Sequence, residues 1–360
     1  RRGRAPLGPR ALAALVAGAS ALLVAAAFAN PGAPAPARSS LARRRSSTGS
    51  SELRGDEVVA VFGATGRTGR LVVDELLRAG CKVVAPVRNA SKAAEVLTED
   101  ERLVILPSDD EAIRVACSQA SAAVWCAEGE DVAAVGAALA EHGPREGGLP
   151  RVVMCSSAAV TRPTWSDARK QRMPGAADIP IVRLNPGDIL GGKRKAEDLL
   201  RKSGASYAIV RPTGLKDDGE WPAGRPILSQ GDVAVGRITR GDVASLLVQM
   251  LREPEATGKT FEAVSVAGYP KPREGYGQAL ARLRPDGARG PGPLGRLRAL
   301  LRGVDAADAA TYGLMQQLLP GEGQDSAGIA MGQTYEQQDR GEEGRLGQRG
   351  EERVPQGFAR

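Results

Sequence analysis

The sequence predicts an α/β protein built on a doubly wound parallel sheet. Short apolar runs alternate with segments whose apolar residues recur at helical spacing, which is typical of strands joined by crossover helices. Only 3% of the 360 residues are aromatic, so Val, Leu, Ile and Ala must form most of the core, as in a parallel sheet covered on both faces. A glycine-rich turn after the first apolar run supports the same fold, because such turns join the first strand to its helix.

The order of the elements follows from the apolar runs and from the turn residues that end them. The first strand is expected over 56–62 and is followed by the glycine turn and a helix over 70–79, which Gly80 ends. Further strands are expected over 82–87, 103–106, 122–126, 151–155, 207–210 and 261–265, and further helices over 132–141, 193–202 and 242–251.

Composition divides the chain into three parts. Residues 1–55 form a targeting leader and linker, 56–270 the α/β domain, and 271–360 an irregular extension of low complexity. The extension is rich in Gly, Pro, Arg, Gln and Glu, with short helices expected over 294–301 and 311–319. This composition favours a solvated segment. The alternative is a docking segment for a protein partner or a membrane.

The leader has two sections. Arginines precede an uncharged apolar run over 11–29, which ends in the small-x-small cleavage signature Ala27-Phe28-Ala29. Residues 30–51 contain no acid and are rich in Ser and Arg, as transit peptides are. The layout predicts delivery to a plastid (chloroplast) and a mature protein that is soluble or peripheral to a membrane. The alternatives are a retained membrane anchor, since the run is just long enough to span, and the secretory pathway.

Charge and cysteine usage argue against two classes of function. The formal net charge is +7, but much of the excess lies in the leader, and the core shows no interleaved basic and aromatic residues. We therefore expect no nucleic-acid partner. His142 is the only histidine and no Cys-x-x-Cys pair occurs, so neither a metal site nor a histidine-based triad is expected.

The glycine turn has the fingerprint of a Rossmann-type dinucleotide site. Gly63 allows the tight turn, Gly66 lets the backbone approach a pyrophosphate, and Gly69 lets the helix pack closely on the sheet. The phosphates then meet the amides at the start of the helix. Cofactor binding is therefore predicted for Gly63, Thr65, Gly66, Arg67, Thr68 and Gly69.

The end of the second strand indicates which dinucleotide binds. Sites for NAD usually place a carboxylate there to hold the ribose 2′-hydroxyl. Here the strand ends at Arg88 without an acid, and a guanidinium can bind a 2′-phosphate. Arg67 can approach the same phosphate, so NADP(H) is the predicted cofactor. Asp109 either accepts a hydrogen bond from the adenine amino group or caps a helix.

Several motifs together resemble a known family. The Gly-x-x-Gly-x-x-Gly spacing and the segments 185–215 and 238–244 are similar to the atypical, NmrA-like branch of the short-chain dehydrogenase/reductases. The landmarks span Val58 to about Ser265, which is nearly the whole domain. The resemblance implies a Rossmann fold that binds NAD(P), with a small C-terminal region on the substrate side.

The same resemblance assigns catalytic positions. Active members use a Ser after the fifth strand and a Tyr-x-x-x-Lys pair, in which the Lys also holds the nicotinamide ribose. Ser156 matches the Ser and Lys193 the Lys, but Ile189 stands at the Tyr position and cannot donate a proton. Tyr207 is nearby in sequence, but it falls within a strand and is expected in the core.

Two functions follow from this departure. The first is a nucleotide-binding regulator or assembly factor, with a protein partner bound through the C-terminal extension. The second is an NADPH-dependent reductase of a small molecule that relies on Lys193, on Ser156 or on an acid carried by the substrate. A separate hypothesis concerns Cys126 and Cys155, expected at the carboxyl ends of neighbouring strands, which either form a redox pair or are small buried residues.

Overall fold

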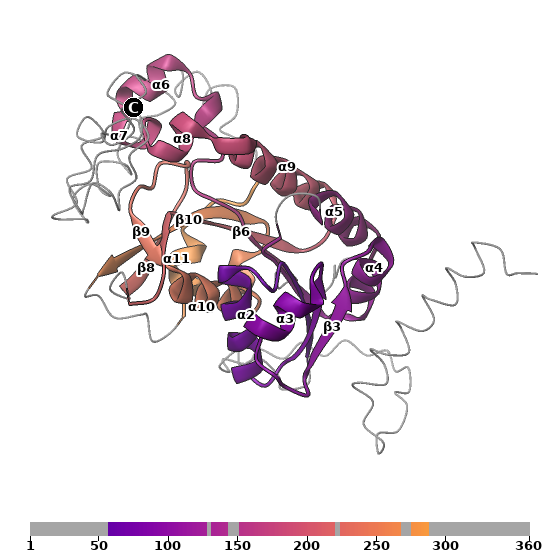
Figure 1. The fold of residues 1–360 in the computed structure, drawn as a ribbon. Helices are drawn as coiled ribbons and strands as arrows, with labels where there is room; N and C mark the ends of the chain where they lie inside the picture. The colour runs from indigo at the N-terminus through magenta and orange to yellow at the C-terminus, as the bar shows by residue number, and fades with distance from the viewer. Residues whose placement is uncertain (1–56, 128–130, 143–150, 220–223, 268–274, 288–360) are drawn as a thin grey trace, which may run out of the picture.

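The computed structural model describes residues 57–127, 131–142, 151–219, 224–267 and 275–287 (Figure 1). Its main feature is an eight-stranded sheet in the order β3-β2-β1-β4-β5-β6-β10-β8. The strands are β1 (Val58–Phe62), β2 (Lys82–Val87), β3 (Leu103–Pro107), β4 (Ala122–Trp125), β5 (Val152–Cys155), β6 (Tyr207–Pro212), β8 (Gly224–Ser229) and β10 (Lys259–Ala267). The seven strands expected from the sequence are β1 to β6 and β10, and they pair in parallel, which confirms the doubly wound α/β fold.

The eighth strand was not predicted. β8 pairs antiparallel with β10 at the edge of the sheet and contains Pro226. Proline weakens the strand signal in a sequence, yet an edge strand tolerates it because one side needs no ladder hydrogen bond. A separate two-stranded sheet pairs β7 (Gly214–Lys216) with β9 (Arg237–Thr239).

Helices cover both faces of the main sheet (Figure 1). α2 (Arg67–Arg78) and α10 (Arg240–Met250) pack together on one face, while α4 (Asp110–Gln119), α5 (Asp131–His142) and α9 (Ile189–Lys202) cover the other. In α2 the buried side chains recur at helical spacing, as expected: Val72, Val73, Leu76 and Leu77. The short α3 (Ala90–Val96) was not predicted, and α4 was anticipated only through the possible helix cap at Asp109.

The substrate-side region is formed mainly in the middle of the chain. α6 (Asp167–Arg172), α7 (Pro174–Ala177) and α8 (Pro180–Leu184) lie between β5 and α9 and stand apart from the sheet at the top of Figure 1. Trp165, Met173, Leu190 and Val233 belong to a separate small core in this region. The buried Arg162 guanidinium donates to the carbonyls of Asp232, Ala176 and Ala234, which ties the region to the strand-rich half of the domain.

The beginning of the predicted extension packs against the domain. In α11 (Gly277–Ala281), Leu280 is fully buried. Tyr276, which immediately precedes this helix, also belongs to the main core. Tyr207 on β6, expected in the core, is half-buried at its edge, and its hydroxyl donates to Asp286 at 3.1 Å. The predicted leader and the helices expected over 294–301 and 311–319 lie outside the described residues. Among the described helices, none has the length and apolarity needed to cross a membrane.

Candidate functional site

The glycine turn is shaped by two close backbone approaches. Gly63 has φ +81°, and a Cβ there would lie 2.7 Å from the Ala127 nitrogen. At Gly69, a Cβ would lie 2.1 Å from the Gly63 carbonyl oxygen, so α2 can start beside the turn only when this residue has no side chain. The Gly66 amide donates to the Gly63 carbonyl at 3.0 Å and closes the turn. Two of the three predicted glycine roles therefore have a direct steric cause.

The start of α2 is suited to bind phosphate. Gly66 is its N-cap and provides no side-chain cap, and the first turn of the helix contains no acidic residue. The first amides of the helix, from Arg67 to Gly69, therefore lie where an anion can accept their hydrogen bonds and meet the positive end of the helix dipole. These residues fit a dinucleotide pyrophosphate.

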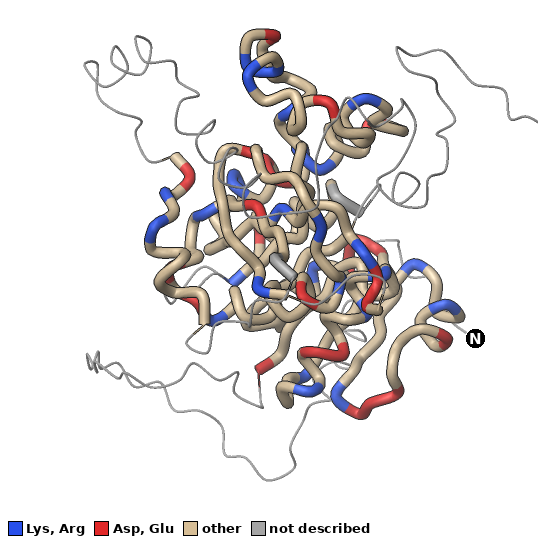
Figure 2. The backbone as a smooth tube through the Cα atoms, turned by 90° about the vertical axis from the view of Figure 1, so that its left-hand side faces the viewer, with Lys and Arg blue, Asp and Glu red and all other residues tan. Residues whose placement is uncertain are grey.

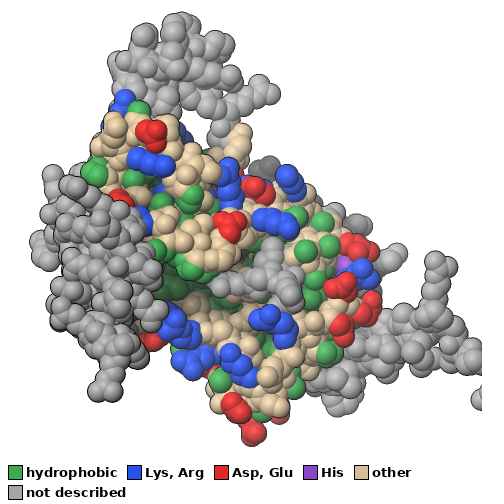
Figure 3. All heavy atoms as spheres, turned by 45° about the horizontal axis from the view of Figure 1, so that its top comes forward, with side chains coloured by type: hydrophobic (Ala, Val, Ile, Leu, Met, Phe, Trp, Pro, Cys, Tyr) green, Lys and Arg blue, Asp and Glu red, His purple; other side chains and the backbone are tan. Residues whose placement is uncertain are grey.

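A cavity of about 720 Å³ extends from this turn along the carboxyl ends of the strands. Figure 3 shows a hollow with hydrophobic side chains inside it and Lys and Arg side chains along one edge. Lys and Arg are intermixed with Asp and Glu along the described backbone (Figure 2), but among the described residues that line the cavity every charged one is basic. These residues are Arg67, Arg88, Lys92, Lys193 and Arg240. The cavity therefore favours a polyanionic ligand.

Two basic residues lie at the end of the cavity next to β2. Arg88 follows the strand directly, and Lys92 lies in the first turn of α3, whose N-cap Asn89 accepts from the Lys92 amide at 2.9 Å. Sequence reasoning missed Lys92. The available signal was an Asn cap immediately after Arg88, which predicts a helix that brings the residue four positions later to the same side.

The structure decides one of the two roles suggested for Asp109. Its carboxylate accepts from the Ala112 amide at 2.8 Å and caps α4. The cavity is lined by the neighbouring Ser108, and Asp109 is not among the lining residues. The capping role is confirmed, whereas a contact with adenine stays a prediction.

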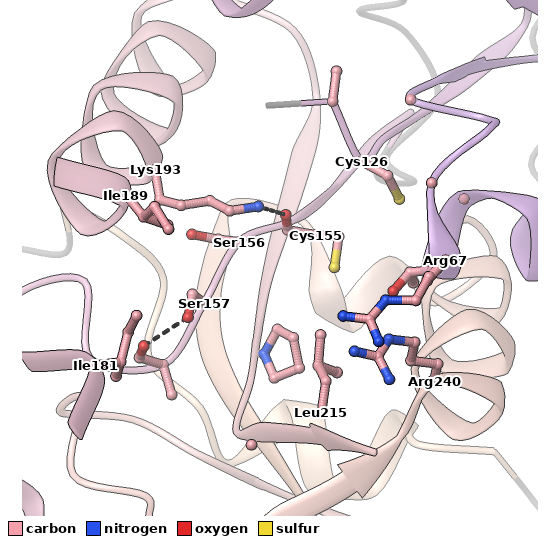
Figure 4. Close-up of a pocket in the computed structure, with 18 of the residues that line it drawn as sticks. Arg67, Cys126, Cys155, Ser156, Ser157, Ile181, Ile189, Lys193, Leu215 and Arg240 are labelled. Carbon is pink, nitrogen blue, oxygen red and sulfur yellow. Dashed lines mark hydrogen bonds between the residues drawn. The ribbon is translucent and has the colours of Figure 1, made fainter. Parts of the chain in front are cut away.

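Arg67 is directed differently from the expectation. Its guanidinium lies 3.5 Å from Asp217, and the same carboxylate accepts from Arg240 at 2.6 Å. Figure 4 shows the two guanidiniums side by side at the wall formed by Leu215. In this arrangement the Arg67 guanidinium is directed towards Asp217, which follows β7, and its contact with a 2′-phosphate stays a prediction. Arg88 and Lys92 therefore form the basic pair nearest β2.

Ser156, predicted as a catalytic residue, is engaged in a buried ionic cluster. Its hydroxyl donates to Glu197 at 2.6 Å. Glu197 is fully buried and also accepts from Arg211 at 2.7 and 2.8 Å and from Arg201 at 2.9 Å. Burial alone raises the pKa of the Glu197 carboxyl, but hydrogen bonds and charge from Arg211, with smaller effects from Ser156 and Arg201, bring that pKa below its usual value. Ser156 thus belongs to a charged structural cluster as well as to the cavity wall.

Lys193 and Ile189 lie one helical turn apart on α9, as the family spacing implies. The buried Lys193 ammonium donates to the Cys155 carbonyl at 3.3 Å, and both residues line the cavity (Figure 4). Ile189 is 42% exposed and also lines the cavity, as do Ile181 and Leu184 of α8. These three side chains give the cavity an apolar wall.

The remaining predictions concern sulfur and histidine. Cys126 and Cys155 both line the cavity, and all four cysteines are thiols. His142 ends α5 at the surface, next to Glu141. Within the described ranges, no group of three or more Cys, His, Asp or Glu residues has the arrangement of a metal site.

Comparison with known proteins identifies the family. A family model described as NAD(P)H-binding matches residues 63–254, which include the glycine turn, α9 and α10. The chain belongs to this NAD(P)H-binding family. The resemblance drawn from the sequence motifs is thereby confirmed, and so is a dinucleotide-binding domain.

Relatives of this NAD(P)H-binding protein include plant proteins. An uncharacterized chloroplastic protein of Arabidopsis thaliana is 33% identical over 236 residues, covering 59% of this chain and 78% of the relative. Protein TIC 62, chloroplastic, of the same plant is 28% identical over 243 residues, covering 60% of this chain but only 37% of TIC 62. Among solved structures, a short-chain dehydrogenase/reductase from Veillonella parvula in complex with NADP has 19% identity and a TM-score of 0.47, covering 60% of this chain and 99% of that chain.

Proposed function

We propose that this chain is an NADP(H)-binding protein of the plastid that acts as a nucleotide-binding regulator or assembly factor. One observation carries the proposal: a complete nucleotide cradle lies beside a catalytic position that offers no proton. The glycine turn and the amides of α2 are arranged for a pyrophosphate, while Ile189 stands where the family's active members have Tyr.

NADP(H) is favoured over NAD(H) by the charges near β2. Arg88 and Lys92 line this end of the cavity, and none of the described residues that line it has a carboxylate. An NAD-specific carboxylate would repel a 2′-phosphate, whereas a guanidinium and an ammonium bind one through charge-assisted hydrogen bonds.

The groups around the nicotinamide position are poor proton donors. General acid catalysis typically contributes about 10²–10⁴-fold, and a side chain must reach the substrate oxygen to provide it. Ile189 has no proton to give, the Ser156 hydroxyl donates to Glu197, and the Lys193 ammonium donates to the Cys155 carbonyl. When NADPH is bound it supplies a hydride, and these residues do not complete the transfer to a simple carbonyl.

Location and partners are inferred from the relatives and from composition. The names of several relatives, including TIC 62, describe them as chloroplastic. The acid-free sequence of residues 1–51 agrees with a plastid transit leader. Residues 288–360 are long enough to bind a protein partner outside the nucleotide domain.

A second candidate is an NADPH-dependent reductase, favoured by the apolar wall of Ile181, Leu184 and Ile189 beside Lys193. Sanguinarine reductase of Eschscholzia californica is 39% identical over 103 residues, which cover 28% of this chain and 35% of that enzyme. A hydride acceptor whose reduced form is stable as an anion, such as a quinone, would need no acid at position 189.

The two candidates are separated by turnover. NADPH is first titrated into the full chain by calorimetry, and its oxidation is then followed with aldehydes, enones and quinones. The regulator predicts tight NADPH binding without turnover of any of the three classes. Turnover of a quinone or enone near the enzyme median of about 10 s⁻¹ would establish the reductase and overturn the regulator.

A further inference from the structure

Two cysteines lie at the ends of neighbouring strands and line the cavity. β4 and β5 pair in parallel, and the last pair of their register is Trp125 with Met154. Cys155 is the last residue of β5, and Cys126 directly follows β4. Neighbouring strands lie about 4.8 Å apart. Disulfides form between Cα atoms about 4.4–6.8 Å apart. Figure 4 shows both sulfur atoms directed into the cavity.

The other two cysteines lack this environment. Cys81 and Cys117 are buried, and neither is among the residues that line the cavity. Burial raises the pKa of the Cys117 thiol to about 12, so it stays protonated at neutral pH and is a poor nucleophile. Cys126 is only half-buried and is therefore the cysteine of the pair that a reagent in the cavity reaches first.

We propose that Cys126 and Cys155 are a redox-active dithiol, and that their oxidation to a disulfide weakens NADP(H) binding. The oxidant is a disulfide, either of a small thiol such as glutathione or of a dithiol protein. The Cys126 thiolate attacks this disulfide and releases one thiol, and the Cys155 thiolate then attacks the Cys126 sulfur and releases the second. One S–S bond breaks and one forms, the two cysteines lose two electrons, and their protons pass to the two thiols released.

Each cysteine contacts an element that binds the nucleotide. The Cys126 amide donates to the Phe62 carbonyl at 2.8 Å, immediately before Gly63, and the Cys126 carbonyl carbon lies 2.7 Å from where a Gly63 Cβ would be. The Cys155 carbonyl accepts from Lys193. The pair therefore lies between the glycine turn and the base of α9.

The strand order gives the direction of the effect. β4 lies between β1 and β5, so any adjustment that disulfide geometry requires of Cys126 is towards β5 and away from the Phe62 carbonyl. Weakening that hydrogen bond loosens the glycine turn, and the expected loss of NADPH affinity is roughly fivefold, the equivalent of about one neutral hydrogen bond. By linkage, bound nucleotide favours the dithiol to the same extent.

The test uses the full chain in glutathione buffers of increasing oxidised fraction. Samples without nucleotide are alkylated, digested without reductant and analysed by mass spectrometry, and the NADPH Kd of the reduced and oxidised protein is measured by calorimetry. The expected result is a peptide pair joined through Cys126 and Cys155, with a Kd about fivefold higher after oxidation. Cys126→Ala and Cys155→Ala should each abolish the joined peptides and the redox dependence of the Kd, whereas Cys117→Ala should preserve both.

Three results would overturn the inference: no Cys126–Cys155 linkage in any buffer, an unchanged Kd in protein that carries the linkage, or a redox response that Cys117→Ala removes. The coupling rests on the proposed nucleotide site, but the linkage is read without nucleotide. A protein that fails to prefer NADPH while still forming the disulfide therefore contradicts the proposed function and not the dithiol.

Discussion

Glu197→Gln is expected to destabilise the fold while leaving nucleotide affinity unchanged. Glu197 is fully buried and accepts four hydrogen bonds, two of them from the buried Arg211. Gln preserves the shape but replaces one carboxylate oxygen with an amide donor, so Arg211 loses the only carboxylate with which a hydrogen bond is described. Breaking a buried ion pair by removing one partner typically costs about 3–5 kcal/mol. For a domain of this size that corresponds to a fall in Tm of roughly 6–20 °C.

The pH dependence of this stabilisation follows from the pKa of Glu197. The pKa of the folded carboxyl lies below its usual value, with burial opposed and outweighed mainly by Arg211. The contribution is therefore fully present above the unfolded pKa of about 4.3 and is lost as the pH falls through the folded pKa. The stability difference between the unmodified protein and Glu197→Gln should be largest at neutral pH and should shrink in acid.

Urea unfolding followed by circular dichroism measures the effect, with two variants for calibration. Asp198→Asn alters a neighbouring carboxylate that is 53% exposed and pairs with Arg201, and it should cost less than about 1 kcal/mol. Ser156→Ala removes one hydrogen bond to Glu197 and should cost about 1 kcal/mol. A loss below 1 kcal/mol for Glu197→Gln would refute the view that this cluster stabilises the fold.

Three further predictions concern the nucleotide site. Arg88→Asp should weaken NADPH binding tenfold or more and leave NADH binding nearly unchanged in calorimetry, since a charge-assisted contact is worth roughly 1.5–3 kcal/mol; an equal loss for both nucleotides would contradict the 2′-phosphate role. Gly69→Ala places a Cβ 2.1 Å from the Gly63 carbonyl and should abolish measurable nucleotide binding, whereas Gly192→Ala, with open space around its Cβ, should not. Ile189→Tyr should keep the NADPH Kd within about twofold and raise any trace carbonyl reduction by up to ~10²-fold, measured by NADPH absorbance. A much higher Kd would show that position 189 contributes to nucleotide binding.

The main fold could be predicted from local patterns, because each parallel strand is a short apolar run closed by a turn signal. Helices α6 to α8 could not be predicted, since each has no more than six residues and the latter two begin with Pro. Such segments are too short to show periodicity, and their helical structure depends on packing around Met173 and Leu190.

Some residues of the candidate site could likewise be predicted from local sequence, whereas the contacts of others could not. The glycine turn and Arg88 lie within one strand–turn–helix–strand unit, so their roles follow from neighbouring residues. Ser156 reaches Glu197 across 41 positions and Arg67 reaches Asp217 across 150, so no local pattern indicates either contact. The resemblance to the short-chain dehydrogenase/reductases placed Ser156 and Lys193 on the cavity wall but did not indicate the partners that hold them.

We propose that this domain binds NADPH through a site for the 2′-phosphate. The most direct measurement titrates NADPH and NADH by calorimetry into the same preparation of the full chain at moderate ionic strength. With Arg88 and Lys92 at the end of β2, NADPH should bind at least about tenfold more tightly, the equivalent of one charge-assisted contact. Equal dissociation constants, or a preference for NADH, would contradict a 2′-phosphate site at the end of β2.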